Sequence, residues 1–378
     1  MNPVIEALYR HGVPSQADVD AFVRDNQFPL IEPGRVTFIY RGFAEEVHLR
    51  RWISGLSTEQ PLQPLEDSGL WALTMDLPDN SRFEYKFEVM RGGARHLVLD
   101  ELNGVLAHDP FGANSVCQGY GYRRPAWTLH DATARSGSLA SLSLYSAAFQ
   151  QQREVQVYVP ARFRRNRTYP LLVVHDGLDY LRYADLRNVL DNLIHRQEIP
   201  AMIVALTQSA ERLVEYTGDE RHARFLGDDL LPALMAKFPI LDDSAAHGLA
   251  GASLGGVAAL HAASRYPHRF GRLLLQSGSF AFSDLGHHKK GPVFDPVVRF
   301  VNCYRKNPFP LAEKIYLSCG IYESLIYENR SLVPLLQAQG MQVNFEEARD
   351  AHNWENWRDR LRQGLSWLFP GPLWMVYE

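Results

Sequence analysis

Hydrophobic and polar residues follow two different patterns along the chain. Between about residues 35 and 116, short runs such as 36–42 and 83–89 alternate with a period of two, and Gly, Pro, Asp and Asn separate them. This alternation is typical of strands with one buried face. Because short strands with frequent turns are typical of β-sandwiches, we predict an N-terminal all-β, immunoglobulin-like sandwich that follows a short helical lead over residues 1–30.

The second pattern begins near residue 139. The runs 170–177 and 201–208 are apolar almost throughout and end in polar residues, as in parallel strands that are buried on both faces. Segments with helical spacing come between and after these runs, which indicates an α/β fold with a mainly parallel central sheet flanked by helices. We therefore predict three parts, namely a helical lead plus sandwich over residues 1–125, a linker over 126–138, and an α/β domain over 139–378.

Composition and charge narrow the class of protein. The chain of 378 residues has 39 lysines and arginines against 43 aspartates and glutamates, a formal net charge of −4, which gives little support to a nucleic-acid partner. No stretch reaches the roughly 18 to 20 apolar residues of a membrane span, and no secretory leader is visible, so we expect a cytoplasmic protein without a membrane partner. Three scattered cysteines favour a reducing compartment over a disulfide framework.

The sharpest chemical signal is the sequence Gly251-Ala-Ser253-Leu-Gly255, a G-x-S-x-G motif. A short apolar run precedes it and a helical pattern follows it, which predicts a tight strand-to-helix turn that exposes the serine hydroxyl. Glycines suit such a turn because a Cβ atom would clash in it. We therefore predict Ser253 as a nucleophile and the amide of Leu254, at the start of the helix, as an oxyanion donor.

A serine nucleophile needs a base, and a triad needs an acid between serine and base in this chain order. His352 lies on a short loop after the strand-like run 342–349 and is the predicted base, although a surface imidazole has the same local pattern. Glu323 follows the run 314–320 and is the predicted acid. Glu328 and Asp350 are competitors for this role, and a dyad without an acid is a further alternative.

A second oxyanion donor is expected in the loop after the first buried strand. His175, Asp176 and Gly177 occupy this loop, and the amide of Leu178 is the predicted donor. No His, Asp or Glu cluster with ligand spacing surrounds Asp176, so we predict no metal site. The imidazoles of His175, His247 and His261 are expected to be structural.

With these residues in place, the chain resembles the enterochelin (ferric-enterobactin) esterases of the esterase-D group of α/β-hydrolases. The N-terminal part, which ends in the sequence from Asp109 to Val116, is similar to the family's own N-terminal domain. One departure is that many members have Gly-Gly-His-Asp at the base, where this chain has Asp350-Ala-His352-Asn353. The segments that carry the resemblance are 171–177, 211–232, 251–280, 320–332 and 350–361.

The resemblance implies an α/β-hydrolase that cleaves the serine trilactone of a catecholate siderophore inside the cell and thereby releases its iron. It implies Ser253, His352 and Glu323 as the triad and no cofactor. The small-molecule substrate is an anion, so a protein of net charge −4 needs a local basic patch to attract it. The candidates for substrate binding are Arg212, Arg221, Arg224 and Trp354.

Each of these residues also has an ordinary structural interpretation. The arginines stand near Glu215, Glu220 and Asp228 and are equally suited to ion pairs with them. Of Trp354 and Trp357, one is expected to pack in the core. Two other functions fit the pattern, namely a feruloyl or acetyl esterase with a sugar-binding-like N-terminal domain, and a siderophore-binding protein without catalysis.

Overall fold

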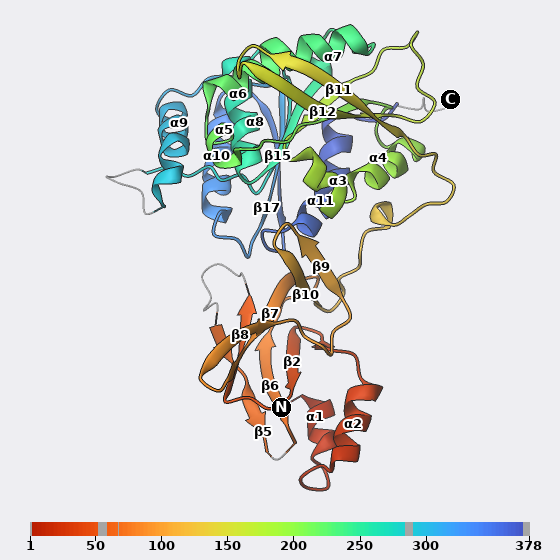
Figure 1. The fold of residues 1–378 in the computed structure, drawn as a ribbon, viewed down its shortest axis with the longest axis vertical. Coiled ribbons are helices and arrows are strands. Elements are labelled where there is room, and N and C mark those ends of the chain that lie inside the picture. Colours follow the sequence, from red (N-terminus) through yellow and green to blue (C-terminus); the bar gives the residue numbers. More distant parts are fainter. Residues whose placement is uncertain (1, 52–58, 67, 284–289, 373–378) are drawn as a thin grey trace. The chain divides into compact units, whose positions relative to one another are not determined.

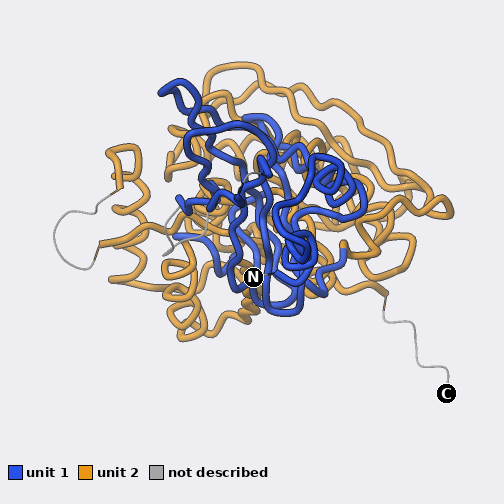
Figure 2. The backbone as a smooth tube through the Cα atoms, turned by 90° about the horizontal axis from the view of Figure 1, so that it is seen from below, with its two compact units in different colours: residues 1–123, 320–324, 349–353 blue, residues 124–319, 325–348, 354–378 orange. Residues whose placement is uncertain are grey.

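A computed structural model describes residues 2–51, 59–66, 68–283 and 290–372 (Figure 1). These residues form two compact units, which are coloured separately in Figure 2. Unit 1 comprises residues 1–123 together with the short segments 320–324 and 349–353. Unit 2 comprises residues 124–319, 325–348 and 354–378. Two short stretches from the C-terminal half of the chain therefore belong with the N-terminal residues.

Unit 1 begins with two helices and continues as antiparallel sheets. The helices are α1 (Pro3–Leu8) and α2 (Gln16–Asp25), and the Ser15 side chain caps the second one. One sheet has the order β1-β2-β6-β5 and the other β4-β3-β7-β10-β9, with β8 beside β7. The strands are β1 (Leu30–Glu32), β2 (Arg35–Arg41), β3 (Glu46–Arg51), β4 (Glu59–Pro61), β5 (Gln63–Leu65), β6 (Leu70–Asp76), β7 (Arg82–Arg91), β8 (Ala94–Val98), β9 (Leu106–Asp109) and β10 (Gly112–Gln118).

The core of unit 1 lies between its two sheets. Phe83, Tyr85 and Phe87 alternate along β7 and are fully buried, and Phe38 from the other sheet packs edge-on against Tyr85 with ring centroids 4.8 Å apart. Edge-to-face packing of this kind is favourable for aromatic rings. The period of two in the sequence is therefore the signature of one buried sheet face, and the predicted antiparallel strands are present in this region.

Unit 2 is built around a mixed sheet with the order β11-β12-β14-β13-β15-β16-β17-β18. The first two pairings are antiparallel, and the pairings from β14 through β13, β15 and β16 to β17 are parallel. The predicted mainly parallel sheet with helices is confirmed at this level. The strands are β11 (Ser138–Ser146), β12 (Gln151–Val159), β13 (Leu171–Val174), β14 (Ile203–Leu206), β15 (His247–Ala252), β16 (Arg272–Gln276), β17 (Lys314–Gly320) and β18 (Gln342–Ala348).

Helices cover both faces of this sheet, as Figure 1 shows. Leu171 and Val173 belong to one hydrophobic cluster, and the intervening Leu172 and Val174 to the other. This explains the continuous apolar run, because each face of a central parallel strand is buried. One cluster packs against α3 (Gly177–Tyr183), α4 (Leu186–His195) and α11 (Trp354–Leu368), and the other against α6 (Glu220–Arg224), α7 (Leu231–Lys237), α8 (Leu254–Arg265), α9 (Asp295–Lys306) and α10 (Ile326–Ala338).

The remaining described elements are short. They are α5 (Arg212–Glu215), a π-helical segment over Phe225–Leu230, and 3-10 turns at Ala126–Thr128, Ser244–Ala246 and Pro292–Phe294. Within the part of the chain that the structure describes, no helix combines the length and the apolar character needed to cross a bilayer. The candidate site residues lie in loops that follow strands of the sheet of unit 2 and in the helices next to these loops.

Candidate active site

Ser253 occupies a sharp turn between β15 and α8. Its backbone has φ 57° and ψ −121°, a strained conformation for a residue with a side chain. The turn is held by the Ser253 amide, which donates to the Gln276 carbonyl at 2.9 Å. A Cβ atom on Gly251 would lie 2.4 Å from the carbonyl oxygen of Gly255, so the first glycine of the motif is required by close backbone contact. The Ser253 Oγ lies 3.1 Å from the Oγ of Ser279.

The two backbone amides that the sequence suggests as oxyanion donors lie in the first turns of helices. Leu254 is the first residue of α8, and the first amides of a helix have no partner within the helix. Leu178 is the second residue of α3, and its amide donates to the side-chain oxygen of Gln208 at 3.3 Å. The loop before it is tied to both neighbouring strands, because His175 donates to the Ala250 carbonyl at 2.9 Å and Gly177 to the Thr207 carbonyl at 2.8 Å.

Glu323 and His352 lie together within unit 1. The Nδ1 atom of His352 is 2.7 Å from the Oε2 atom of Glu323, whose carboxylate is buried. The other carboxylate oxygen accepts from the Gly320 amide at 2.8 Å. A carboxylate only accepts hydrogen bonds, so Nδ1 carries the proton and a neutral imidazole keeps its lone pair on Nε2. The pair therefore has the form of a carboxylate that orients a base.

The competing acids have other partners. Glu328, in the first turn of α10, forms an ion pair with Lys290 at 2.9 Å. Asp350 accepts hydrogen bonds from the Ala351 amide at 2.7 Å, from Asn353 at 2.8 Å and from Arg82 at 3.3 Å. Of the three carboxylates that the sequence suggests, Glu323 makes the hydrogen bond to His352. Ser253, Leu254 and Leu178 belong to unit 2, and Glu323 and His352 to unit 1.

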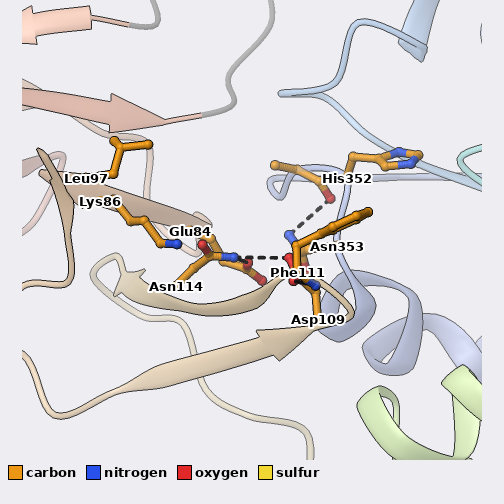
Figure 3. A pocket seen from close by; sticks show the side chains of 9 residues that line it. Glu84, Lys86, Leu97, Asp109, Phe111, Asn114, His352 and Asn353 are labelled. Atoms are coloured by element: carbon orange, nitrogen blue, oxygen red, sulfur yellow. Dashed lines mark hydrogen bonds between the residues drawn. The ribbon is translucent and has the colours of Figure 1, made fainter. Parts of the chain in front are cut away.

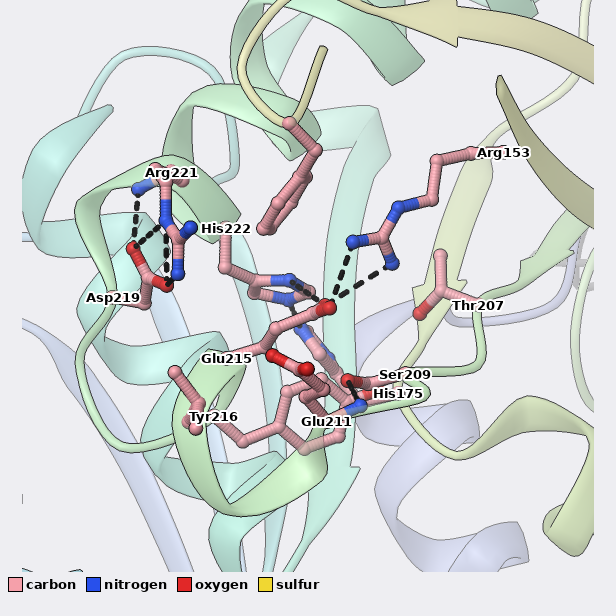
Figure 4. Close-up of polar contacts among 12 residues, drawn as sticks. Arg153, His175, Thr207, Ser209, Glu211, Glu215, Tyr216, Asp219, Arg221 and His222 are labelled. Carbon is pink, nitrogen blue, oxygen red and sulfur yellow. Dashed lines mark hydrogen bonds and ion pairs between the residues drawn. The ribbon is translucent and has the colours of Figure 1, made fainter. Parts of the chain in front are cut away.

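The three candidate arginines have different surroundings. Arg212 donates to Asp176 at 2.8 Å and to the Ala252 carbonyl at 3.4 Å, so it joins the loop of Leu178 to the turn of Ser253. Arg221 is paired with Asp219 at 2.6 Å, as Figure 4 shows, and Arg224 is exposed. The three carboxylates that the sequence suggests as partners of these arginines have other partners. Glu215 pairs with Arg153, Glu220 pairs with Arg265, and Asp228 accepts a hydrogen bond from Tyr266.

Trp354 and Trp357 divide as expected between surface and core. Trp354, at the start of α11, is half-buried, and its ring packs edge-on against Tyr180 at 5.2 Å and against Trp357 at 4.8 Å. Trp357 is buried, and its indole donates to the Ser277 Oγ at 2.9 Å. Of the two tryptophans, Trp354 is the one with a partly accessible ring.

A polar cluster around His175, His222 and Glu215 is buried in unit 2 and was not expected from the sequence (Figure 4). His175 Nδ1 lies 2.8 Å from the Ala250 carbonyl and must donate to it, so His175 Nε2 accepts the proton of His222 Nε2 at 3.1 Å. Burial lowers the pKa of His175 to about 3, which keeps this imidazole neutral. Glu215 completes the cluster. Burial raises the pKa of Glu215, but the contact with His222, whose Nδ1 lies 3.6 Å away, and the hydrogen bonds from Arg153 outweigh this effect and lower it to about 2.

His352 lines a cavity of about 330 Å³ in unit 1 (Figure 3). Phe111, at the tip of the turn between β9 and β10, is 95% exposed and lines the cavity with Lys86. In the sequence, Phe111 stands in a turn and outside the alternating core positions, and this position could have indicated a surface role for its ring. Its lining is completed by Glu84, Leu97, Asp109, Asn114, Ala351 and Asn353. Within the described ranges, no group of three or more His, Cys, Asp or Glu side chains is arranged to hold a metal ion.

These features agree with the family comparison. Residues 146–368, more than half of the chain, match the model of the family described as "Putative esterase", and the chain belongs to this family. The esterase family resemblance seen in the sequence is thereby confirmed. Among curated proteins, the iron(III) enterobactin esterase of Escherichia coli K12 is 29% identical over 202 residues, which cover 52% of this chain and 48% of that protein. The chain thus spans about half the length of the curated relatives it matches.

Solved structures show the same fold. The ferric enterobactin esterase of Salmonella typhimurium superposes with a TM-score of 0.76 at 21% identity, covering 92% of this chain and 98% of the other. The enterobactin esterase of Shigella flexneri, crystallised in the presence of enterobactin, gives a TM-score of 0.73 at 22% identity over 92% of this chain and 97% of the other. At 21–22% identity the likeness establishes the fold alone.

Proposed function

We propose that this protein is a serine esterase that hydrolyses the trilactone ester bonds of a catecholate siderophore similar to enterobactin and so releases iron. The observation that carries the catalytic part is the 2.7 Å hydrogen bond between His352 and Glu323 in a chain of an esterase family. The names of the relatives, iron(III) enterobactin esterases, support the substrate. We assign unit 2 to the α/β-hydrolase fold and the sheets of unit 1 to an immunoglobulin-like sandwich.

In the proposed mechanism, His352 Nε2 takes the Ser253 proton as Oγ attacks a lactone carbonyl. The Glu323 carboxylate holds the Nδ1 proton and stabilises the imidazolium that forms. The amides of Leu254 and Leu178 stabilise the oxyanion, and for this the Leu178 amide exchanges its Gln208 acceptor for the substrate oxygen. The imidazolium then protonates the leaving alkoxide, which is the serine oxygen of the opened siderophore lactone. Water, activated by the same imidazole, hydrolyses the acyl-enzyme.

Substrate recognition is proposed to use local cations and rings. Lys86 and Phe111 line the same cavity as His352, and an ammonium group and an aromatic ring in one cavity suit an anionic catecholate arm. The volume of about 330 Å³ is near the lower end for ligand pockets, which favours one arm of the siderophore over the whole molecule. Arg224 is exposed and Trp354 is half-buried, and we propose that both bind the rest of the siderophore. Arg212 and Arg221 each pair with a carboxylate that offsets their charge, so we propose a smaller part in siderophore binding for them.

The direct test is mass analysis of products after incubation with ferric enterobactin, iron-free enterobactin and a feruloylated sugar. We expect opening of the trilactone and then dihydroxybenzoyl-serine fragments, and no product with Ser253→Ala. Release of ferulate without trilactone cleavage would contradict the proposed substrate. Tight siderophore binding with no product and no labelling of Ser253 by a fluorophosphonate would show a binding protein instead of an enzyme.

A further inference from the structure

Arg82 is a buried cation at the start of β7. Its side chain is 1% exposed, and its Nη1 donates to the Asn353 Oδ1 at 2.9 Å and to the Asp350 Oδ1 at 3.3 Å. Its backbone amide donates to the Arg349 carbonyl at 2.8 Å. A charge buried to this degree is costly unless it is well paired. The partners of Arg82 stand 268 and 271 positions away in the sequence and immediately flank the segment Ala351-His352.

Asp350 and Asn353 are also bonded to each other. The Asp350 carboxylate accepts from the Ala351 amide at 2.7 Å and from the Asn353 side chain at 2.8 Å. Arg82 therefore contacts both ends of the turn that presents His352. Both bonds come from Nη1, whose two N–H groups lie in the plane of the guanidinium group, so they restrain the turn in direction as well as in distance.

The neighbours of Arg82 contact the segment of the acid. Ser81 Oγ lies 2.5 Å from the hydroxyl of Tyr322, and the Tyr322 amide donates to the Asp350 carbonyl at 3.2 Å. Arg349 in turn donates to the Asp79 carbonyl at 2.6 Å. The tight turn 79–82 ahead of β7 thus touches both segments that carry the Glu323–His352 pair.

We infer that Arg82 is a positioning residue for the Glu323–His352 pair, so that a strand of the N-terminal β-sheets takes part in arranging the reaction centre. This inference rests on the proposed esterase function. Small displacements of a catalytic group are expensive, since about 1 Å of misplacement lowers the rate by about 100-fold. Arg82 does not need to touch the substrate to have this effect.

The test compares Arg82→Gln and Arg82→Lys with Arg50→Gln. Arg50 is the control, because it is likewise a strand arginine of unit 1 that is paired with carboxylates, and its partners Glu59 and Glu88 both lie on the N-terminal strands β4 and β7. With a p-nitrophenyl ester as substrate, we expect Arg82→Gln to lower kcat by about 10- to 100-fold with KM changed by less than about twofold. Arg82→Lys is expected to lose less activity, and Arg50→Gln to stay within about twofold of the wild type.

A spectroscopic measurement separates positioning from general stability. The Nδ1 proton that His352 shares with Glu323 is expected as a low-field proton NMR signal in the wild type and in Arg50→Gln. We expect this signal to disappear in Arg82→Gln samples that circular dichroism shows to be folded. If Arg82→Gln does not fold, Arg82→Lys carries the same comparison, because it keeps the buried positive charge and loses the planar guanidinium group.

The double variant Arg82→Gln/Asp350→Asn tests the alternative that Arg82 only neutralises a buried carboxylate. Restoration of wild-type kcat in the double variant would overturn the inference, as would a single variant with wild-type kcat and an intact low-field signal. Persistent loss in the double variant supports it. A wild type that cleaves the p-nitrophenyl ester but no siderophore would refute the proposed substrate and leave the Arg82 comparison valid. A wild type that cleaves neither would refute the esterase, and the NMR signal would then decide the positioning.

Discussion

The turn that carries Ser253 and the segments that carry Glu323 and His352 are held in opposite ways. The first depends on residues nearer in the sequence, since Gly251 allows the backbone to close, α8 begins at the next residue, and the bonds with Gln276 and Arg212 span at most 40 positions. The second depends on partners more than 200 positions away, in particular Ser81 and Arg82. We therefore expect the turn of Ser253 to be less sensitive to distant changes, whereas the proposed acid–base pair should respond to mutations in a β-sheet that supplies none of the proposed catalytic residues.

The largest effect is expected at the local turn. Ser253→Ala removes the proposed nucleophile without disturbing the backbone, and kcat should fall by about 10⁶-fold, as for other serine triads. Steady-state assays with a p-nitrophenyl ester measure this, and circular dichroism checks the fold. Ser279→Ala, which removes the neighbouring hydroxyl, is the control and should retain most of the activity. Similar losses in the two variants would argue against Ser253 as the nucleophile.

The next effect is expected at the acid. Glu323→Gln replaces the acceptor of the His352 Nδ1 proton by an amide that is free to present a donor, which favours the wrong tautomer, and kcat should fall by about 10³- to 10⁴-fold. Glu328→Gln provides the matched control from the same part of the chain, and its kcat should stay within about threefold of the wild type. An inverted result would identify Glu328 as the acid.

A smaller effect is expected at Glu215, in the buried polar cluster that contains His175. Because the pKa of Glu215 is lowered from 4.5 to about 2, this group stabilises the fold above pH 4.5, and the stabilisation is lost as the pH falls toward 2. The difference in unfolding free energy between the wild type and Glu215→Gln should therefore narrow by about 2 kcal/mol between pH 6 and pH 3. Urea unfolding at several pH values measures it. Glu211→Gln removes an exposed carboxylate of the same segment, and an equal narrowing there would contradict the assignment.

The smallest effect tests the long-range contact of the acid segment. Tyr322→Phe removes the hydroxyl that lies 2.5 Å from Ser81 and should destabilise the protein by about 1 kcal/mol, with a few-fold loss of kcat. Thermal unfolding and ester hydrolysis measure the two quantities. Tyr327→Phe, whose ring is exposed, is the control and should change neither. Equal behaviour of both variants would show that the Tyr322 hydroxyl contributes nothing to the pair.

Sequence reasoning reached those features whose cause is local. The G-x-S-x-G spacing led to the turn of Ser253, and the continuous apolar runs led to strands buried on both faces. Chain order led to Glu323 and His352, which the structure joins by a hydrogen bond, while their catalytic roles and the predicted domain boundaries remain predictions.

The features that sequence reasoning missed depend on tertiary contacts. Arg82 has the local pattern of an ordinary polar residue at the start of a strand, and its pairing with Asp350 and Asn353 follows only from the fold. The same holds for Arg153, whose partner Glu215 lies 62 positions away. Spacing suggested Glu215 as a partner of the candidate arginines, but several carboxylates are near them in sequence and only the folded geometry selects Asp176 and Asp219.

The contacts of the turn 79–82 also bear on protein engineering. A fragment that starts at residue 124 would still contain Ser253, Glu323 and His352, yet it would lack the arginine and the hydroxyl that fasten the last two. Chimeras that exchange the N-terminal region to change substrate preference should therefore take residues 79–82 from the same parent protein as Glu323 and His352. Lys86 on β7, Leu97 on β8 and Phe111 in the β9–β10 turn are the better sites for variation, because they line the cavity and lie outside the turn 79–82.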